Sequence, residues 1–176
     1  MGRYYGIYSH GDYVMIKAKK KTKYVGLPSD DGSFTTFYKL KNRKTIAFKD
    51  FADKDAAEEA YHMQKTLAEY DLAPRVYGKV RKIDYFDYLG YKRRSNWGYV
   101  TEIAELIDDE RYSDDPDYYD EVRCETEELS NEIDFHCGYG FYDCHMRNVG
   151  YVTRKGRKVL VCIDTGAESF NGEYAY

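Results

Sequence analysis

The sequence predicts an α+β fold of two lobes, an N-terminal antiparallel sheet with one helix and a reduced helical C-terminal lobe with a β-hairpin. Two observations lead to this prediction. Short β-branched or aromatic segments separated by turn residues fill the first fifty residues, and apolar residues later recur at helical spacing. A chain of 176 residues is long enough for two such lobes. We expect them to be residues 1–104 and 105–176.

The strands expected in the N-terminal lobe are short segments rich in β-forming residues and bounded by Gly, Pro, Asp or Asn. Four of them precede a predicted helix. Two follow it, on either side of a polar loop that contains Arg93, Arg94, Ser95 and Asn96. We therefore expect a sheet of five or six strands, at about 13–18, 23–27, 34–40, 45–49, 76–83 and 97–102.

One helix is predicted in this lobe, over residues 54–70, where apolar side chains recur at helical spacing. The pair Asp55 and Glu58 resembles a capping box at its start, and Pro74 lies just past its end. The expected inner face consists of Ala56, Ala60, Met63 and Leu67.

The C-terminal lobe is predicted to begin with a long acidic helix. Asp115 can cap a helix whose first residue is Pro116. Beyond it, strands at 149–152 and 158–163 are joined by a Lys/Arg/Gly turn, so they form a hairpin whose second strand ends at Asp164. The apolar side of the helix is expected to consist of Tyr118, Val122, Thr126, Leu129 and Ile133.

Charge is distributed unevenly along the chain. Residues 1–50 contain 11 Lys and Arg against 4 Asp and Glu, whereas residues 102–135 contain 2 against 15. The acidic stretch would attract a basic partner protein. The basic run from Lys17 to Lys23 would suit nucleic acid, but its alternation with Tyr24 and Val25 favours the solvated face of a strand, so nucleic acid is not the expected partner.

The sequence contains neither a membrane span nor a secretory signal. No stretch approaches the ~18 apolar residues that a span needs, and the N-terminus lacks an apolar run. The four cysteines form no C-x-x-C pair, which favours reduced thiols. A zinc site built from 136–137 and 144–145 is disfavoured, because adjacent residues point in different directions. We expect a cytoplasmic protein that is not associated with a membrane.

The most informative segment is 143–148, which reads Asp-Cys-His-Met-Arg-Asn, and it is followed after the hairpin by Asp164, Thr165 and Gly166. In this order of motifs the chain resembles the protein-kinase-like superfamily. The catalytic loop of that family has a base Asp five residues before a metal-binding Asn, and an Asp-x-Gly after the next strand supplies a second metal ligand. With His145, the loop is more similar to aminoglycoside and choline phosphotransferases than to ordinary protein kinases.

The resemblance implies that ATP and Mg²⁺ bind between the two lobes. It implies Asn148 and Asp164 as ligands of Mg²⁺, and an amide and a carboxylate are the kind of hard oxygen ligands that Mg²⁺ requires. It further implies that Asp143 is the catalytic base, which accepts the proton of an attacking hydroxyl.

The resemblance continues upstream, where Ile-Ala-Phe-Lys at 46–49 matches the family's Val-Ala-Ile-Lys strand. It implies that Lys49 contacts the α- and β-phosphates of ATP. In the next helix, Glu59 would pair with Lys49 as the family's helix glutamate does, with Glu58 as the alternative.

Two further nucleotide-binding segments are implied. Residues 30–39 resemble the second half of the family's glycine-rich loop, although only Gly32, followed by Ser33, matches a loop glycine, and Asp30 and Thr35 replace two others. The end of the strand at 97–102 corresponds to the family's hinge, whose backbone binds the adenine edge. The implied hinge residues are Glu102, Ile103 and Ala104.

The chain also departs from the family pattern. Phe141 and Tyr142 replace the His and Arg that usually precede the catalytic Asp, so no contact with an activation-loop phosphate is expected. The resemblance covers about residues 24–170, and we expect the activation segment and the substrate-binding helices of a full kinase to be missing.

The predicted function is that of an ATP- and Mg²⁺-dependent kinase acting on a protein (Ser, Thr or Tyr) or a small-molecule hydroxyl. The main alternative is a kinase-like pseudoenzyme that serves as a protein-binding scaffold or inhibitor. Nucleotidyl transfer by the same fold and a basic nucleic-acid-binding sheet are further alternatives. A homo-oligomer or a partner protein would supply surface that the short C-terminal lobe lacks.

Overall fold

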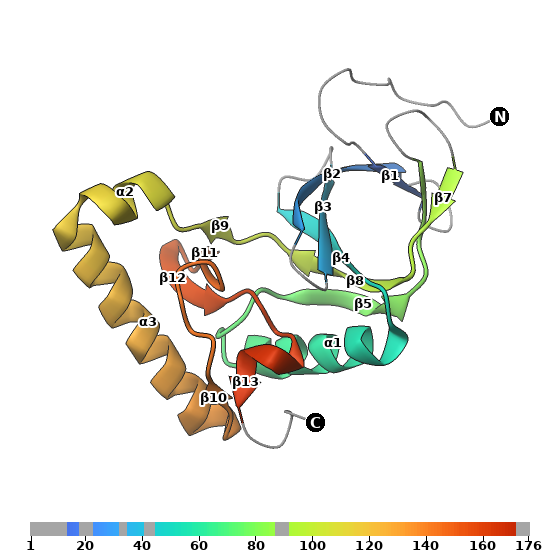
Figure 1. The fold of residues 1–176 in the computed structure, drawn as a ribbon. Coiled ribbons are helices and arrows are strands. Elements are labelled where there is room, and N and C mark those ends of the chain that lie inside the picture. The colour runs from blue at the N-terminus through green and yellow to red at the C-terminus, as the bar shows by residue number, and fades with distance from the viewer. Residues whose placement is uncertain (1–13, 18–22, 32–34, 41–44, 87–91, 172–176) are drawn as a thin grey trace. The chain divides into compact units, whose positions relative to one another are not determined.

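The computed structural model describes residues 14–17, 23–31, 35–40, 45–86 and 92–171 (Figure 1). The chain divides into two compact units, and each is described by itself. Unit 1 comprises residues 1–58 and 77–101, and unit 2 comprises residues 59–76 and 102–176. In the described part of the chain, no helix combines the length and the apolar character needed to cross a membrane. The fold is α+β, as the sequence predicted.

Unit 1 is built on one sheet, whose strands have the order β5-β8-β4-β3-β2-β1-β6-β7. The neighbours β1–β2, β2–β3, β3–β4, β1–β6 and β6–β7 are antiparallel. The strands are β1 (Val14–Lys17), β2 (Lys23–Asp31), β3 (Thr35–Leu40), β4 (Ile46–Phe51), β5 (Val76–Arg81), β6 (Asp84–Phe86), β7 (Lys92–Arg94) and β8 (Trp97–Glu102).

The predicted number of five or six strands in this sheet was wrong, because the described residues form an eight-stranded sheet. The segment around Arg93, expected to be a polar loop, contains β7, which pairs with β6. Each of these strands is only three residues long and β7 is entirely charged, so neither shows the apolar alternation that marks a strand in sequence. A cross-strand ion pair helps to join them, since the Nε of Arg94 donates to Oδ1 of Asp84 at 2.7 Å.

Gly98 allows β8 to lie against β4. A Cβ atom at this position would lie 1.9 Å from the carbonyl oxygen of Lys49 and 2.6 Å from the ring of Phe48. Neither atom can yield easily, because one is backbone and the other belongs to a buried ring. Glycine is therefore required where β8 lies beside its neighbour β4, the strand that carries Lys49.

Helix α1 (Lys54–Glu69) begins one residue after its actual cap, Asp53. Oδ1 of Asp53 accepts hydrogen bonds from the backbone N–H groups of Asp55 and Ala56, at 2.8 and 3.0 Å. The predicted capping box was therefore wrong, and Glu58 pairs instead with Lys54 at 2.9 Å. The predicted inner face was also shifted at its start. Ala56 is exposed, and the buried apolar residues are Ala57, Ala60, Met63 and Leu67.

Unit 2 contains α2 (Asp109–Asp114) and α3 (Pro116–Cys137). The predicted start of α3 is confirmed, because the side chain of Asp115 accepts a hydrogen bond from the N–H of Tyr118 at 3.1 Å and Pro116 is the first helical residue. Gly138 ends the helix at φ 71°. Helix α2 was not predicted, since it buries no residue and so has no apolar periodicity. The predicted apolar side of α3 is buried at Val122, Thr126, Leu129 and Ile133.

A hairpin of β11 (Val149–Arg154) and β12 (Arg157–Cys162) forms the centre of unit 2, close to the predicted bounds. Its turn has left-handed residues at Lys155 and Gly156, with φ of 50° and 80°. The short strand β9 (Glu105–Leu106) pairs with β11. A separate pair, β10 (Gly140–Phe141) and β13 (Phe170–Asn171), was not predicted, nor was the 3-10 helix at Ala167–Ser169.

One apolar core explains why residues 59–76 belong to unit 2, although the sequence prediction assigned them to the first lobe. Side chains from the second half of α1 and the loop that follows it pack with those of α3 and the hairpin. The members include Met63, Leu67, Leu72, Ala73, Ile107, Val122, Leu129, Ile133, Phe141, Val149, Leu160, Cys162 and Phe170.

The substitution Gly98→Ala is expected to lower the free energy of unfolding of unit 1 by about 2 kcal/mol or more, because the added methyl collides with backbone. Urea denaturation followed by circular dichroism measures this change. Asn96→Ala, at an exposed neighbouring position, serves as the control and should change the free energy by less than about 0.5 kcal/mol. Equal stability of the two variants would contradict the close approach.

Candidate functional site

The hairpin of unit 2 brings together the two segments that carry the predicted metal ligands. Asn148 directly precedes β11, and Asp164 follows β12 by two residues. The carbonyl oxygen of Asn148 accepts hydrogen bonds from the backbone N–H groups of Ile163 and Asp164, at 2.9 and 3.4 Å. Strand pairing, which sets Val149 opposite Cys162, thus fixes the two residues next to each other.

The side-chain amide of Asn148 faces Asp143. Its Nδ2 donates to the carbonyl oxygen of Asp143 at 3.0 Å and to Oδ2 of the same residue at 2.8 Å. Since both partners are acceptors, the nitrogen of the amide must be the atom that faces them. The amide oxygen, Oδ1, therefore points away from the Asp143 carboxylate.

His145 lies against the other oxygen of the Asp143 carboxylate. Its Nε2 is 3.2 Å from Oδ1 of Asp143, and its Nδ1 accepts a hydrogen bond from the N–H of Arg147 at 3.2 Å. Because Nδ1 accepts a hydrogen bond, a neutral His145 ring carries its hydrogen on Nε2. Nε2 therefore donates to Asp143. The 3.3 Å contact between Nε2 and Nδ2 of Asn148 is then a contact between two donors and not a hydrogen bond.

Each oxygen of the Asp164 carboxylate accepts one hydrogen bond. Oδ1 accepts from the N–H of Gly166 at 3.1 Å, and Oδ2 accepts from the hydroxyl of Ser169 at 2.8 Å. A carboxylate has about four lone-pair positions, so both oxygens keep the capacity to bind a cation. The carbonyl oxygen of the same residue accepts from the thiol of Cys162 at 2.9 Å.

The start of the loop at 143–148 is anchored by its neighbours in the core. Phe141, in β10, stacks on Phe170, in β13, with ring centroids 5.3 Å apart. The thiol of Cys144 donates to the carbonyl oxygen of Thr126 in α3 at 3.4 Å. Burial, together with the charge of Asp143, raises the pKa of Cys144 to about 12, so this cysteine is a neutral anchor and not a nucleophile.

The donors of this cluster fit a Mg²⁺ ion. Asn148 offers an amide oxygen that faces away from Asp143, and Asp164 offers carboxylate oxygens with free lone pairs. Among the described residues there is no group of three or more His, Cys, Asp or Glu side chains that would hold a metal ion. A bound Mg²⁺ would therefore complete its coordination with water or with oxygens of its ligand, as Mg²⁺ commonly does.

Lys49 lies in β4 of unit 1 and is buried, with 9% of its surface exposed. Its ammonium group is 5.9 Å from the centroid of the Tyr99 ring. Glu59 is exposed on α1 and belongs to unit 2. The ion pair between Lys49 and Glu59 stays a prediction, as does a phosphate contact of Lys49.

Asp50 follows Lys49 in sequence, and burial disfavours the charged form of its side chain. Burial raises the pKa of Asp50 to about 6, although hydrogen bonds from backbone N–H groups, among them those of Asn96 and Trp97, act in the opposite direction. Its Oδ1 is buried without a hydrogen-bond partner in the described part of the chain. Because the folded state favours the protonated form, the stability that Asp50 contributes is lost as the pH rises from about 4 through about 6.

Some of the predicted nucleotide-binding residues outside the cluster lie in the described part of the chain and others do not. Gly32 and Ser33 lie outside the described residues. Ile103 and Ala104 connect β8 to β9 and have no regular secondary structure, so their backbone is not part of a strand. The backbone N–H of Glu102 donates to the carbonyl oxygen of Arg75 at 2.8 Å, so this group already has a partner within unit 2. The adenine contact stays a prediction.

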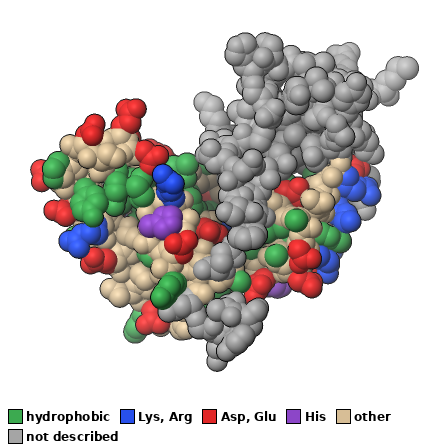
Figure 2. Space-filling view, viewed as in Figure 1, with side chains coloured by type: hydrophobic (Ala, Val, Ile, Leu, Met, Phe, Trp, Pro, Cys, Tyr) green, Lys and Arg blue, Asp and Glu red, His purple; other side chains and the backbone are tan. Residues whose placement is uncertain are grey.

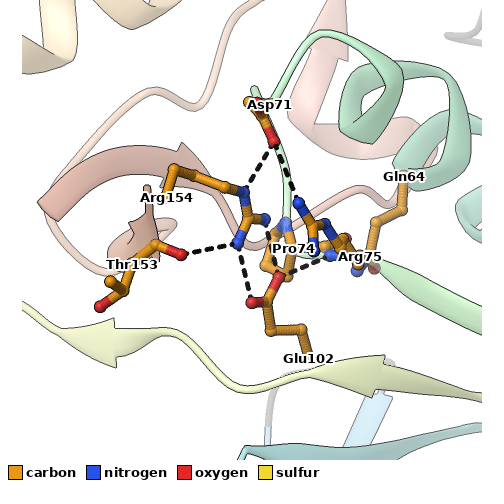
Figure 3. A network of polar contacts seen from close by, with 7 residues as sticks. All are labelled: Gln64, Asp71, Pro74, Arg75, Glu102, Thr153 and Arg154. Carbon is orange, nitrogen blue, oxygen red and sulfur yellow. Dashed lines mark hydrogen bonds and ion pairs between the residues drawn. The ribbon is translucent and has the colours of Figure 1, made fainter. Parts of the chain in front are cut away.

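The side chain of Glu102 has a structural role that sequence reasoning missed (Figure 3). Arg154 is 7% exposed and binds both carboxylate oxygens of Glu102, at 2.8 and 2.7 Å. Its Nε donates to Asp71 at 2.7 Å, and the backbone N–H of Arg75 donates to Glu102 at 3.0 Å. Burial alone would raise the pKa of Glu102, but the hydrogen bonds from Arg154 and Arg75 lower it overall. The network joins the end of β8, the loop after α1 and the end of β11.

The outer surface of α2 and α3 is strongly acidic, as the sequence predicted. The two arginines of this region each pair with a carboxylate four residues further along the chain. Arg111 pairs with Asp115 at 3.3 Å, and Arg123 pairs with Glu127 at 3.2 Å. The remaining carboxylates give the region an excess of negative charge, and red side chains are spread over it in Figure 2. Phe135, near the end of α3, is 82% exposed.

No protein-family model matches the sequence, and no curated protein is significantly similar to it. The resemblance to the protein-kinase-like superfamily therefore depends on the ordered motifs alone.

The Arg154–Glu102 pair is expected to be necessary for the stability of unit 2. Arg154→Met leaves a largely buried carboxylate without its cation and should lower the free energy of unfolding by about 3 kcal/mol at pH 7. The double variant Arg154→Met/Glu102→Leu should recover most of this loss. Urea denaturation measures both, with Arg111→Met as an exposed ion-pair control that should cost less than about 1 kcal/mol.

The same pair predicts a dependence on pH. Since the pKa of Glu102 is lowered in the folded state, its contribution is present at neutral pH and is lost as the pH falls through the folded-state pKa. The difference in stability between wild type and Arg154→Met should therefore narrow in acid. A difference that stays constant from pH 7 to pH 3 would contradict this assignment.

Proposed function

We propose that this protein is an ATP- and Mg²⁺-dependent kinase of the protein-kinase-like superfamily, which transfers the γ-phosphate to a hydroxyl group of a protein or a small molecule. The observation that supports it most is the cluster of Asp143, Asn148 and Asp164. A base, an amide and a second carboxylate are held by direct hydrogen bonds at one end of a hairpin, in the order along the chain that phosphotransferases use.

In this proposal, Asn148 and Asp164 hold the metal ion. Mg²⁺ would neutralise charge on the phosphate oxygens when bound. Asn148 contributes Oδ1, because its nitrogen faces Asp143, and Asp164 contributes carboxylate oxygens oriented by Gly166 and Ser169. Lys49 would contact the α- and β-phosphates, with Glu59 as its partner, and the backbone of residues 102–104 together with Gly32 and Ser33 would contact the nucleotide.

Asp143 is the proposed base. Its carboxylate accepts one hydrogen bond at each oxygen, from Asn148 and from His145, and it is exposed, so a lone pair is accessible to an acceptor hydroxyl. As the hydroxyl oxygen bonds to the γ-phosphorus, Asp143 takes the hydroxyl proton, and the electron pair of the breaking P–O bond leaves with ADP. The two donors keep the carboxylate oriented for this step.

The acidic surface of α2 and α3 favours a basic acceptor or partner protein, since it would steer positive charge toward unit 2. A self-associated form of the chain would bring together its basic first fifty residues and this acidic region in different copies. A cytoplasmic location, where Mg·ATP is abundant, belongs to the same proposal.

The test combines binding and turnover. Saturating Mg·ATP should raise the melting temperature of the wild type by about 5 °C or more, and Asp164→Ala should remove most of this rise. Asp143→Ala should retain the rise, because it removes no metal ligand, but should lower phosphate transfer at least about 100-fold. Asp134→Ala, which removes an exposed carboxylate from α3, is the matched control and should behave as wild type.

The outcomes separate the alternatives. A wild type that Mg·ATP does not stabilise would rule out the kinase. Stabilisation without phosphate transfer to a panel of basic proteins and small hydroxyl compounds would favour the pseudoenzyme that acts as a protein-binding scaffold or inhibitor.

A further inference from the structure

Ser169 contacts both acidic residues of the candidate site, although it lies outside every motif in the sequence. It is fully buried, at 0% exposure, at the end of the 3-10 helix that follows Asp164. Its hydroxyl donates to Oδ2 of Asp164 at 2.8 Å. Its carbonyl oxygen accepts hydrogen bonds from the backbone N–H groups of Tyr142 and Asp143, at 2.9 and 3.1 Å.

The two ends of Ser169 therefore act on different residues. The carbonyl oxygen fixes the backbone at Asp143, and any residue at position 169 would provide that oxygen. The hydroxyl fixes the rotation of the Asp164 carboxylate, and only a side chain with a donor can do so. Since Gly166 holds the other oxygen of Asp164 through its backbone, the hydroxyl of Ser169 is the side-chain contribution to this orientation.

We propose that Ser169 is a positioning residue, which orients the Asp164 carboxylate for Mg²⁺ and couples it to the loop of Asp143. This inference rests on the proposed function, because it assumes that Asp164 is a metal ligand. Groups that orient a ligand by a hydrogen bond commonly change metal affinity more than they change the fold. The hydroxyl keeps one Asp164 oxygen turned toward the core and leaves the remaining lone pairs in a fixed direction.

The experiment uses Ser169→Ala and the matched control Ser95→Ala. Ser95 is also a buried serine, and its Oγ accepts a hydrogen bond from the N–H of Ile83 at 2.7 Å, so its removal costs a comparable buried contact in unit 1. The readout is the Mg²⁺ concentration that gives half of the thermal stabilisation by a non-hydrolysable ATP analogue. Phosphate transfer at saturating Mg²⁺ is measured in parallel.

Ser169→Ala should require roughly 10-fold more Mg²⁺ for half stabilisation, while its turnover at saturating Mg²⁺ stays close to wild type. Ser95→Ala should lower the melting temperature without changing the Mg²⁺ midpoint. If Ser169→Ala does not fold, Ser169→Cys is used, because it keeps the size of the side chain with a weaker donor and should shift the midpoint in the same direction.

The failures are distinguishable. An unchanged Mg²⁺ midpoint in the Ser169 variant, with a wild type that responds to Mg²⁺, would overturn the positioning role and leave the kinase proposal standing. A wild type without any response to Mg²⁺ and the analogue would overturn the kinase proposal and the role of Ser169 with it.

Discussion

Asn148 makes hydrogen bonds to both neighbouring segments of the candidate site. Its side-chain nitrogen bonds to the carbonyl and the carboxylate of Asp143, and its backbone oxygen accepts from the two residues that follow β12. The loop of the proposed base and the segment of Asp164 are thereby joined through one residue. If Asn148 were replaced, the orientation of both carboxylates would lose a common support, and the amide oxygen proposed for Mg²⁺ would be lost as well.

This arrangement depends on the apolar core of unit 2. The hairpin is held against α3 and the second half of α1 by buried side chains such as Leu67, Ile133 and Val149. The Arg154–Glu102 pair ties the far end of β11 to the end of β8, and the Phe141–Phe170 stack fixes the start of the loop. These buried contacts supply most of the stability of the unit. The polar cluster can therefore remain partly exposed to solvent, where a ligand could reach it.

Local signals in the sequence predicted the parts of the fold that depend on neighbours along the chain. Asp115 and Pro116 specified the start of α3, and the alternation around 149–163 specified the hairpin. The order of Asp143, Asn148 and Asp164 was sufficient to predict that they belong together. Ser169 could not be predicted, since its role comes from contacts with residues that lie five and more than twenty-five positions away. Strands β6 and β7 were missed for a related reason, because they are joined by backbone pairing and an ion pair and have no apolar pattern along the chain.

The central claim is that Asn148 and Asp164 form a metal site beside Asp143, and paramagnetic broadening by Mn²⁺ tests it directly. Backbone amide signals of the isotope-labelled protein are recorded while Mn²⁺ is added in the presence of a non-hydrolysable ATP analogue. Signals of residues 143–148 and 164–166 should lose intensity first, and Asp164→Ala should prevent this loss. Broadening centred on the acidic surface of α2 and α3, or no selective broadening at all, would contradict the claim.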